Sequence, residues 1–586
     1  MKILLTCTSI EDDHRVEDNH DSHYPLGLAY IQSYIESRRP GQDQFINVYL
    51  NNIPTVKCNS IIKNHFKKFK PEVFGVSMMT HSRVSAYRVI EYVHKHYPDT
   101  HIVVGGIHAT IMWQQIVKKY PYVVIVRGEG EVTFHELIEA FESKKLIDDI
   151  AGIVHCNNGK IVATESRELI NDLDDLPFPK HELFVNQEKR MANLLTSRGC
   201  PYRCNFCVLD WMSKRKVRFR SGENIADEVE MILEKFPSIT TIWIHDDAFM
   251  INQRRTIEFC DAIIKRGIKT QFIASARFRP ISYEVVDKME QAGFVQVLFG
   301  LETAAESVMK GMRKGITKDD VRYGLELFGR TGMKATAFLI AGLPGETDET
   351  IKETIRFIQE IQNINYLFYD DIGVAMMYPG TELYASAKET GKINDDYWLT
   401  DANVPFYTIE HGGVYTYKKL LEMKEEIRKS ISLEYIFTPN GFLRQEKLIP
   451  AILKYSQQFN MGGINNILNE ALQRDHLLLP IIHSFFMGSS EQLNQMVVRS
   501  FEKSVIQIIF NRHLHTQVRR QGFLQLHETQ KKRNVKLFKL YEERKKTAIE
   551  KLSKKYDVGD VEYNKKPKIS NTSKELDFNI STVGGI

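Results

Sequence analysis

The chain has 586 residues, of which 43% are hydrophobic and 26% are charged, and its formal net charge is +4. This is the balance of an ordinary globular protein, and it excludes a mostly disordered chain and a collagen-like one. The net charge is too small over this length to indicate nucleic acid binding, so we expect no nucleic acid partner. At about 150 residues for each domain, the length predicts three or four domains.

The seven cysteines are few and odd in number, which disfavours a disulfide scaffold and favours functional thiols in a reducing compartment. Acidic residues follow the short apolar run at the start of the chain, so we expect no signal peptide. No stretch approaches about 18 uninterrupted apolar residues, the length that a membrane span needs. We therefore expect a cytoplasmic protein.

Short β-rich runs alternate with helix-like segments over residues 1–150. The expected strands are 2–7, 45–50, 73–79, 101–106 and 122–128, and the first expected helix is 26–37. This alternation predicts an α/β fold with a doubly wound parallel sheet. In such sheets ligands bind outside the carboxyl ends of the strands.

Small and polar residues gather at those predicted strand ends. Glycine at several successive ends favours a bulky ligand lying against the backbone, and tight turns are the alternative. The candidate binding residues are Thr80, His81, Ser82, Gly105, Gly106, His108, Ala109, Gly128, Glu129 and Gly130.

Residues 151–188 read as a hairpin turning at Asn158-Gly159, followed by an acidic linker with two prolines. A second alternating region follows over residues 189–400. Its six strand-like runs each precede a helix-like segment, and this pattern predicts a barrel, either open or closed.

Residues 401–556 carry helix-like segments with basic faces, and we expect a helical C-terminal domain and then a flexible tail at 557–586. The apolar run 476–488 and the basic amphipathic run 505–523 suggest contact with the inner membrane surface and a lipid substrate. A helical cap packed on the barrel is the favoured alternative. Aromatic residues near the last barrel strand line the substrate pocket or, as is more common, belong to the core. They are Tyr366, Phe368, Tyr369, Tyr378 and Tyr384.

The strongest motif is TSRGCPYRCNFCVLD, which places Cys200, Cys204 and Cys207 in a C-x3-C-x2-C spacing. A structural zinc site needs four ligands, so it would require a distant histidine such as His245. A 4Fe-4S cluster usually takes four cysteines. Three cysteines leave one iron open to a substrate, which makes the cluster the favoured interpretation.

This motif resembles that of the radical S-adenosylmethionine (SAM) enzymes, and further positions agree in order and spacing. The resemblance implies that Phe206 packs on the adenine of SAM and that Arg277 holds the carboxylate of its methionine. The SAM-binding residues implied by the resemblance are Phe206, Asp246, Asp247, Arg277, Gly300, Glu302 and Gly342. A structural role, such as a helix cap or an ion pair, is the alternative for each of them.

The first half resembles the cobalamin-binding domain of one large class of radical SAM enzymes, through PLGLAYIQSY, VVGGIHAT, VIVRGEGEVTFHEL and DLDDLPFPKHELF. On this resemblance the candidate residues at the strand ends bind cobalamin. No G-x-G-x-x-G follows the first strand, which disfavours a dinucleotide site. One departure concerns D-x-H-x-x-G, whose histidine binds cobalt in methionine synthase-type domains: Asp21 and His23 are present, but Gly27 lies one residue too far along.

The resemblance covers residues 1–400 and implies a radical SAM enzyme with a 4Fe-4S cluster, SAM and cobalamin. It implies C-methylation of a small molecule or lipid, with an electron donor such as a flavodoxin or ferredoxin. A BchE-like cyclase or rearrangement enzyme that uses cobalamin without methyl transfer is one alternative. A cobalamin or iron–sulfur sensor without turnover is another. A tRNA-modifying enzyme is disfavoured by the charge balance.

Overall fold

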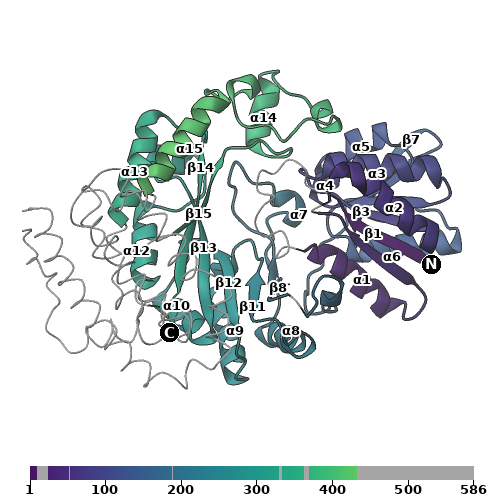
Figure 1. Cartoon of the computed structure of the whole chain (residues 1–586), viewed down its shortest axis with the longest axis horizontal. Helices are drawn as coiled ribbons and strands as arrows, with labels where there is room; N and C mark the ends of the chain where they lie inside the picture. The colour runs from purple at the N-terminus through teal and green to yellow at the C-terminus, as the bar shows by residue number, and fades with distance from the viewer. Residues whose placement is uncertain are drawn as a thin grey trace, which may run out of the picture.

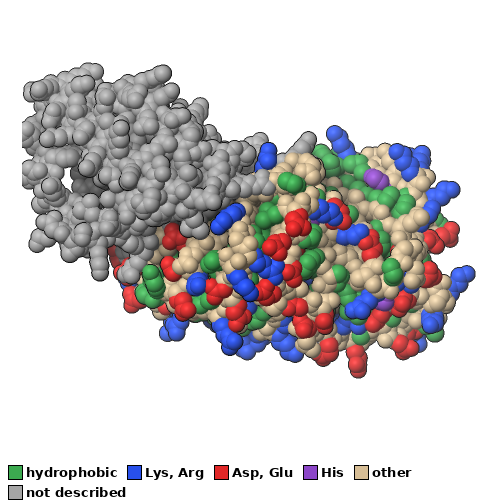
Figure 2. All heavy atoms as spheres, turned by 90° about the horizontal axis from the view of Figure 1, so that it is seen from below, with side chains coloured by type: hydrophobic (Ala, Val, Ile, Leu, Met, Phe, Trp, Pro, Cys, Tyr) green, Lys and Arg blue, Asp and Glu red, His purple; other side chains and the backbone are tan. Residues whose placement is uncertain are grey.

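The computed structural model describes residues 1–431 apart from 9–23, 52, 188, 329–330, 332 and 362–367. The expected helical region beyond residue 431, the tail 557–586 and His23 lie outside the described residues. Figure 1 shows two α/β units, with the N-terminal one in purple and the second in teal and green. None of the described helices is long and apolar enough to cross a bilayer. On the face drawn in Figure 2, acidic and basic side chains are interspersed.

The N-terminal unit is built on a seven-stranded sheet with the order β2-β1-β3-β4-β5-β6-β7. Its strands are β1 (Lys2–Cys7), β2 (Gln44–Tyr49), β3 (Val73–Ser77), β4 (His101–Gly105), β5 (Val123–Val126), β6 (Ile153–Asn157) and β7 (Lys160–Ala163). The first five are parallel, as the sequence predicts. The hairpin expected at Asn158-Gly159 forms, and its strand β6 pairs antiparallel with β5. The sheet therefore continues past residue 150, where we had expected the linker region to begin.

Two layers of helices cover this sheet because successive residues of a buried strand face opposite sides. Ile3 and Leu5 of β1 pack with α1 and α6, whereas Leu4 packs with α2 and α3. The helices are α1 (Leu26–Arg38), α2 (Thr55–Phe69), α3 (Arg83–His96), α4 (Ile107–Ile111), α5 (Trp113–Lys119) and α6 (Glu131–Ser143).

The second unit is a six-stranded parallel sheet with the order β15-β14-β13-β12-β11-β8, and its two edge strands do not pair with each other. The expected barrel is therefore open. Its strands are β8 (Met191–Leu194), β11 (Thr241–Ile244), β12 (Gln271–Ala276), β13 (Phe294–Glu302), β14 (Lys334–Ala341) and β15 (Phe368–Val374). Helices cover the outer face, and Trp243, Ile273 and Leu298 pack together inside.

The helices of this unit are α8 (Gly222–Lys235), α9 (Gln253–Lys265), α10 (Tyr283–Ala292), α11 (Glu306–Gly311), α12 (Lys318–Phe328), α13 (Asp348–Ile361), α14 (Glu382–Glu389) and α15 (Tyr417–Ile431). After β8, the chain enters a loop that begins and ends in the antiparallel ribbon of β9 (Ser197–Arg198) and β10 (Arg218–Phe219) and contains the short helix α7 (Asp210–Ser213). The three cysteines of the motif lie in this loop, which we call the cluster loop, residues 199–217.

The segment after β15 contacts both units: it packs first on the N-terminal unit and then, beyond residue 404, on the barrel. Residues 383–404 pack into the core of the N-terminal unit, where Trp398 is fully buried and its carbonyl accepts from Arg83 Nε at 3.3 Å. Helix α15 returns to the barrel and buries Leu420 and Met423 in its outer core. Figure 1 shows α14 between the two units. The two units are thus joined by packing as well as by the linker.

Candidate functional site

A cavity of about 310 Å³ lies between the two units. One wall consists of the carboxyl ends of β1, β3, β4 and β5, and the other comes from the barrel and the cluster loop. The N-terminal wall includes Leu5, Gly27, Leu28, Gly75, Val103, Gly105, Gly106, Val126, Gly128, Glu129, Gly130, Glu131 and Phe134. The barrel wall includes Leu195, Ser197, Arg198, Gly199, Leu209, Met212, Ser213, Arg218, His245 and Asp247. Both halves of the sequence therefore meet at one cavity.

The N-terminal wall is formed largely by glycines and apolar side chains. Gly106 has φ +94°, and a Cβ there would lie 2.6 Å from the carbonyl oxygen of Met78, so only glycine fits. A Cβ on Gly128 would meet nothing within 4 Å, so the backbone there is open to the cavity. Exposed backbone beside an apolar slot suits a large, flat and mostly apolar group. These residues fit a corrin cofactor.

Five of the ten candidate binding residues at the strand ends line the cavity, namely Gly105, Gly106, Gly128, Glu129 and Gly130. The other five lie outside its lining. Ser82 and Ala109 are buried, and His81 Nε2 bonds the hydroxyl of Tyr378 at 2.7 Å. That contact links the end of β3 to the barrel unit.

His108 is fully buried and is held by side chains on both sides. Its Nδ1 shares a hydrogen bond of 3.1 Å with Thr80 Oγ1, and its Nε2 shares one of 3.2 Å with the hydroxyl of Tyr87. Burial and the nearby charge of Arg83 lower the pKa of His108 to about 3. The histidine is therefore neutral and supports the strand end from behind.

Cys200, Cys204 and Cys207 are free thiols and partly exposed. Burial raises the pKa of the Cys207 thiol to about 11, so metal binding is what would deprotonate it. Among the described residues, no three His, Cys, Asp or Glu side chains are already gathered at ligand distances. Three thiols on one short loop nevertheless form the donor set of a cluster with one open iron. They fit that cluster better than a four-ligand zinc site.

Two side chains bear on the choice of metal and on the open iron. His245, the alternative zinc ligand, has its Nε2 3.0 Å from Asn193 Oδ1 and stacks on Trp243. Arg277 lies beside the cluster loop, with Nη1 4.0 Å from Cys204 Sγ and its guanidinium 3.6 Å from the centre of the Tyr202 ring. Arg277 also donates to the carbonyl oxygen of Lys314, and its buried Nε has no hydrogen-bond partner. A carboxylate approaching the cluster could use that nitrogen.

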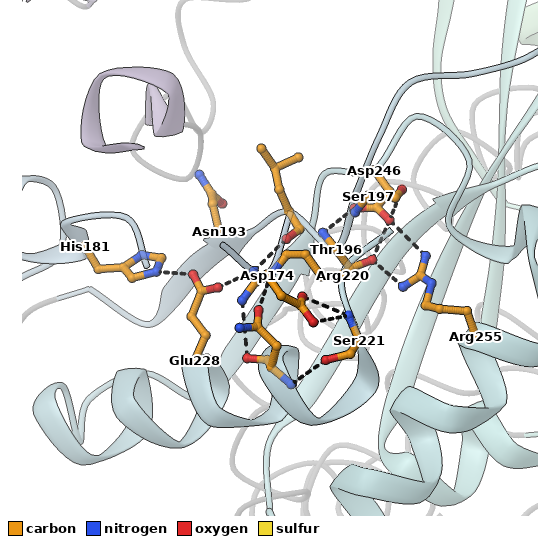
Figure 3. A network of polar contacts seen from close by, with 12 residues as sticks. Asp174, His181, Asn193, Thr196, Ser197, Arg220, Ser221, Glu228, Asp246 and Arg255 are labelled. Carbon is orange, nitrogen blue, oxygen red and sulfur yellow. Dashed lines mark hydrogen bonds and ion pairs between the residues drawn. The ribbon is translucent and has the colours of Figure 1, made fainter. Parts of the chain in front are cut away.

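The two adjacent aspartates that follow β11 have different surroundings, and Figure 3 shows those of Asp246. Asp246 is buried, and it accepts from the backbone N–H groups of Thr196 at 2.7 Å and Ser197 at 3.1 Å, from both of their hydroxyls, and from Arg255 at 3.3 Å. Its carboxylate therefore holds the chain that leads into the cluster loop. Asp247 instead faces the cavity, with the N–H of Gly199 at 3.2 Å. Burial by the surrounding protein, with Asp246 adding to it, raises the pKa of Asp247 to about 6.

A second group of contacts in Figure 3 joins the linker to the barrel. His181 Nε2 lies 2.7 Å from Glu228 Oε1, and both side chains are fully buried. The other oxygen of Glu228 accepts from Arg220, which also donates to the carbonyl oxygen of Leu195 at 2.9 Å. These bonds hold the end of β8, just before the cluster loop.

Three further candidate SAM-binding residues lie at other strand ends. Glu302, in the left-handed region with φ +63°, pairs with Lys314 Nζ at 2.6 Å. A Cβ on Gly300 would lie 2.3 Å from that same Nζ, so a larger residue there would displace the lysine from its present position. Gly342 donates its N–H to Glu346 Oε2 at 2.6 Å, and burial raises the pKa of Glu346 to about 7.

Phe206 packs between the N-terminal core and a small apolar cluster of the barrel unit.

Three charged residues that bond to candidate site residues were not predicted from the sequence, namely Arg198, Arg218 and Lys314. Arg198 lies two residues before the first cysteine of the motif, and this is the one local signal that it carries.

Comparison with family models identifies both units. A model of the radical SAM superfamily matches residues 194–358, and a model of the B12 binding domain matches residues 19–138. Among curated proteins, an uncharacterized methyltransferase of Pyrococcus horikoshii is 27% identical over 444 residues, which cover 74% of this chain and 94% of the relative. An anaerobic magnesium-protoporphyrin IX monomethyl ester cyclase of Rubrivivax gelatinosus is 27% identical over 350 residues, covering 57% of this chain and 62% of the cyclase. Hopanoid C-3 methylase of Methylococcus capsulatus is 24% identical, over 70% of this chain and 76% of the methylase.

Two solved structures share the fold. The cobalamin-dependent SAM radical enzyme OxsB, with aqua-cobalamin and SAM bound, has a TM-score of 0.58 and 18% identity, covering 89% of this chain and 83% of its own. The radical SAM methyltransferase TsrM from Kitasatospora setae, with cobalamin and a 4Fe-4S cluster, has a TM-score of 0.54 and 17% identity, covering 67% and 75%. The predicted cofactor set of a 4Fe-4S cluster, SAM and cobalamin is confirmed at the level of the family. Residues 194–358 therefore match the radical SAM superfamily and residues 19–138 match the B12 binding domain, which confirms the resemblance to cobalamin-binding radical SAM enzymes.

Proposed function

We propose that this enzyme transfers a methyl group to an unactivated carbon of a small molecule or lipid. The observation that carries the proposal is a cavity to which both units contribute: Gly106 and Gly128 lie on one wall, and Gly199 and Asp247 lie on the other. A substrate between these walls would have the cobalamin domain on one side and the cluster loop on the other. The methyltransferases among the relatives support this choice.

The residues of the barrel unit would hold the cluster and SAM and keep water out of the cavity. When bound, the cluster with SAM supplies a carbon-centred radical, and cobalamin supplies a methyl group. Cys200, Cys204 and Cys207 would hold the cluster, and Arg277 lies where it can orient an anionic group of SAM beside Cys204. On the barrel wall, Leu209 and Met212 present apolar surface to the cavity, which helps exclude water from a reactive radical.

Among the polar groups of the barrel wall, we infer that the carboxylate of Asp247 and the imidazole of His245 meet the substrate. Asp247 has a pKa raised by burial to about 6, so it exchanges a proton near neutral pH. His245 is positioned by Asn193 at 3.0 Å on the inner face of the barrel. We infer that these two side chains orient the substrate, while the chemistry of C–H cleavage belongs to the cofactors.

A second candidate is a cyclase or rearrangement activity that uses cobalamin without methyl transfer. The specific observation in its favour is the 27% identity to the anaerobic cyclase of Rubrivivax gelatinosus. That alignment covers 57% of this chain, against 74% for the uncharacterized methyltransferase. Methyl transfer therefore remains the first candidate.

Counting the products of SAM separates these candidates. The anaerobically purified enzyme, loaded with iron, sulfide and hydroxocobalamin, would be incubated with SAM, reduced flavodoxin and fractionated small-molecule or lipid extracts. Methyl transfer predicts both S-adenosylhomocysteine and 5′-deoxyadenosine in amounts that rise together with substrate. Formation of 5′-deoxyadenosine alone would favour the cyclase-type reaction, and neither product would favour a sensor. The Cys204→Ala variant serves as the control without a complete cluster.

A further inference from the structure

The carboxylate of Glu129 lies at the junction of the two cofactor regions. We propose that Glu129 is a positioning residue that couples occupation of the cobalamin cavity to the placement of the cluster loop. This inference rests on the two cofactor assignments and is independent of which substrate is methylated. It concerns a residue that the sequence reasoning had assigned to cobalamin binding alone.

Glu129 makes its contacts across the interface between the units. Its Oε1 accepts from Arg198 Nη1 at 2.9 Å and from Arg218 Nη1 at 2.9 Å, and its Oε2 lies 2.8 Å from the same nitrogen of Arg218. The backbone N–H of Ile170 in the linker also donates to Oε2 at 3.0 Å. The carboxylate thus joins the loop after β5, the linker and both strands of the β9–β10 ribbon.

The two arginines are direct partners in that ribbon, where Arg198 pairs with Arg218 in antiparallel register. Like charges directly opposite each other destabilise a strand pair. A shared carboxylate removes this repulsion and adds two charge-assisted hydrogen bonds. Although burial opposes ionisation, the guanidinium groups of Arg218 and Arg198 hold the pKa of Glu129 below its usual range. The carboxylate is therefore charged. It holds together the β9–β10 ribbon at the base of the cluster loop, which we call the neck of the loop, and it does so from the N-terminal unit.

The neck is also held from the barrel side, but by groups within that unit. Asp246 accepts from Thr196 and Ser197, which directly precede Arg198. Glu131 supplies a second bond from the N-terminal unit, accepting from Arg198 Nη2 at 2.6 Å. Glu129 differs from Glu131 because it alone of the two contacts both strands of the ribbon. It is consequently the group best placed to transmit a displacement from one unit to the whole neck.

The same ion-pair cluster lines the cavity. Glu129, Arg198 and Arg218 are all part of its wall, as are Gly128 and Gly199. A cofactor bound against the N-terminal wall displaces water from these charges, and ion pairs strengthen as the local dielectric falls. Cobalamin binding should therefore tighten the neck of the cluster loop, and an ordered cluster loop should favour cobalamin binding. Such coupling is reciprocal by thermodynamic necessity.

The coupling is measured as the ratio of two dissociation constants for hydroxocobalamin, one with the iron-free protein and one with the 4Fe-4S-loaded protein. The wild type should bind about 5-fold or more tightly when the cluster is present. Glu129→Gln keeps the size of the side chain and removes its charge, so it should still bind both cofactors with a ratio near one. Glu142→Gln is the matched control, because Glu142 pairs with Arg39 within the N-terminal unit at 2.7 Å and is half exposed.

Hydrogen exchange supplies a readout that needs no cluster. Hydroxocobalamin added to the iron-free wild type should slow amide exchange in residues 199–217, and this protection should disappear in Glu129→Gln. Arg218→Gln, which removes the other partner, should give the same loss and covers the case in which Glu129→Gln does not fold. Equal affinities of the wild type with and without the cluster, or full coupling in both variants, would overturn the inference. A wild type that binds no cobalamin would instead overturn the cofactor assignment beneath it.

Discussion

The strand ends of the two units face the same cavity and are built in opposite ways. The N-terminal edge has few side chains: Gly105, Gly106 and Gly128 leave the backbone bare, and His108 is neutral behind them. The barrel edge is dense with charge, and Asp246 and Glu302 are bonded to partners within their own unit. One edge therefore makes room for a large cofactor, whereas the other fixes a loop that must hold a small one. Cofactor binding at the N-terminal edge should be sensitive to substitutions that add atoms. The stability of the barrel edge should be sensitive to substitutions that remove charged groups.

The largest effect is expected from replacing Cys200, Cys204 and Cys207 together by alanine. All iron and sulfide should be lost because the loop then has no thiolate to offer. One cobalamin should still bind, since none of the three cysteines lines the cavity. Iron and sulfide assays with the visible absorbance of hydroxocobalamin check this. Loss of cobalamin stoichiometry together with the iron would show that the two edges do not bind separate cofactors.

Asp246→Ala tests the barrel edge by removing a buried carboxylate. Arg255, which is also buried, would lose its ionic partner, and the N–H groups of Thr196 and Ser197 would lose their acceptor. Breaking such a buried pair is expected to lower the free energy of unfolding by about 3–5 kcal/mol. Urea unfolding of the cofactor-free protein measures it. Glu258→Ala is the control, because its partner Arg254 is 90% exposed and the expected loss is below about 1 kcal/mol.

Gly105→Val tests the N-terminal edge by adding atoms to the cavity. Its Cβ would lie 3.8 Å from the nearest atom, an ordinary contact, so the fold should tolerate it. The rest of the side chain would occupy cofactor space and should raise the dissociation constant of hydroxocobalamin by about 10- to 100-fold. Circular dichroism should remain unchanged. The neighbouring change Gly106→Val should instead prevent folding, because its Cβ would lie 2.6 Å from Met78 O.

The smallest effect concerns the pH dependence that His108 confers on the N-terminal unit. Burial, with Arg83 adding to it, lowers the pKa of His108 to about 3, whereas an unfolded histidine has a pKa of about 6.5. Below about pH 6.5 the unfolded state binds a proton that the folded state does not, so stability is lost as the pH falls. Between pH 6.5 and 5.5 this loss is about 1 kcal/mol. In urea titrations at the two pH values, the free energy of unfolding of His108→Gln should not show this loss. The same pH dependence of that free energy in the wild type and the variant would contradict the prediction.

Both sheets were predictable because their information is local. A buried parallel strand is a short β-rich run, and the runs here alternate with helix-like segments, so the pattern is visible without knowledge of contacts. The cysteine motif is local in the same sense, since three thiols within eight residues predict a metal-binding loop. Gly105, Gly106 and Gly128 were predicted as ligand contacts because ligands bind at strand ends, and the structure places all three in the cavity lining.

The roles of the charged residues were not predictable in this way. Asp246 and Asp247 are neighbours in the chain, yet one holds Thr196 and Ser197 while the other faces the cavity. The sequence also did not indicate that residues 383–404 pack into the N-terminal core through Trp398. An apolar residue in a helix-like segment does not reveal which of two cores it enters.

Local patterning thus set the two parallel sheets, the cluster loop and the bare strand ends of this protein. The tertiary structure decided how these parts face each other, because the deciding interactions join residues that are distant in the chain. Arg198 and Arg218 lie 69 and 89 residues from Glu129, and an ion pair at such separation has no periodic signature. Electrostatic attraction acts through space, so only the folded chain shows that one carboxylate closes the neck of the cluster loop.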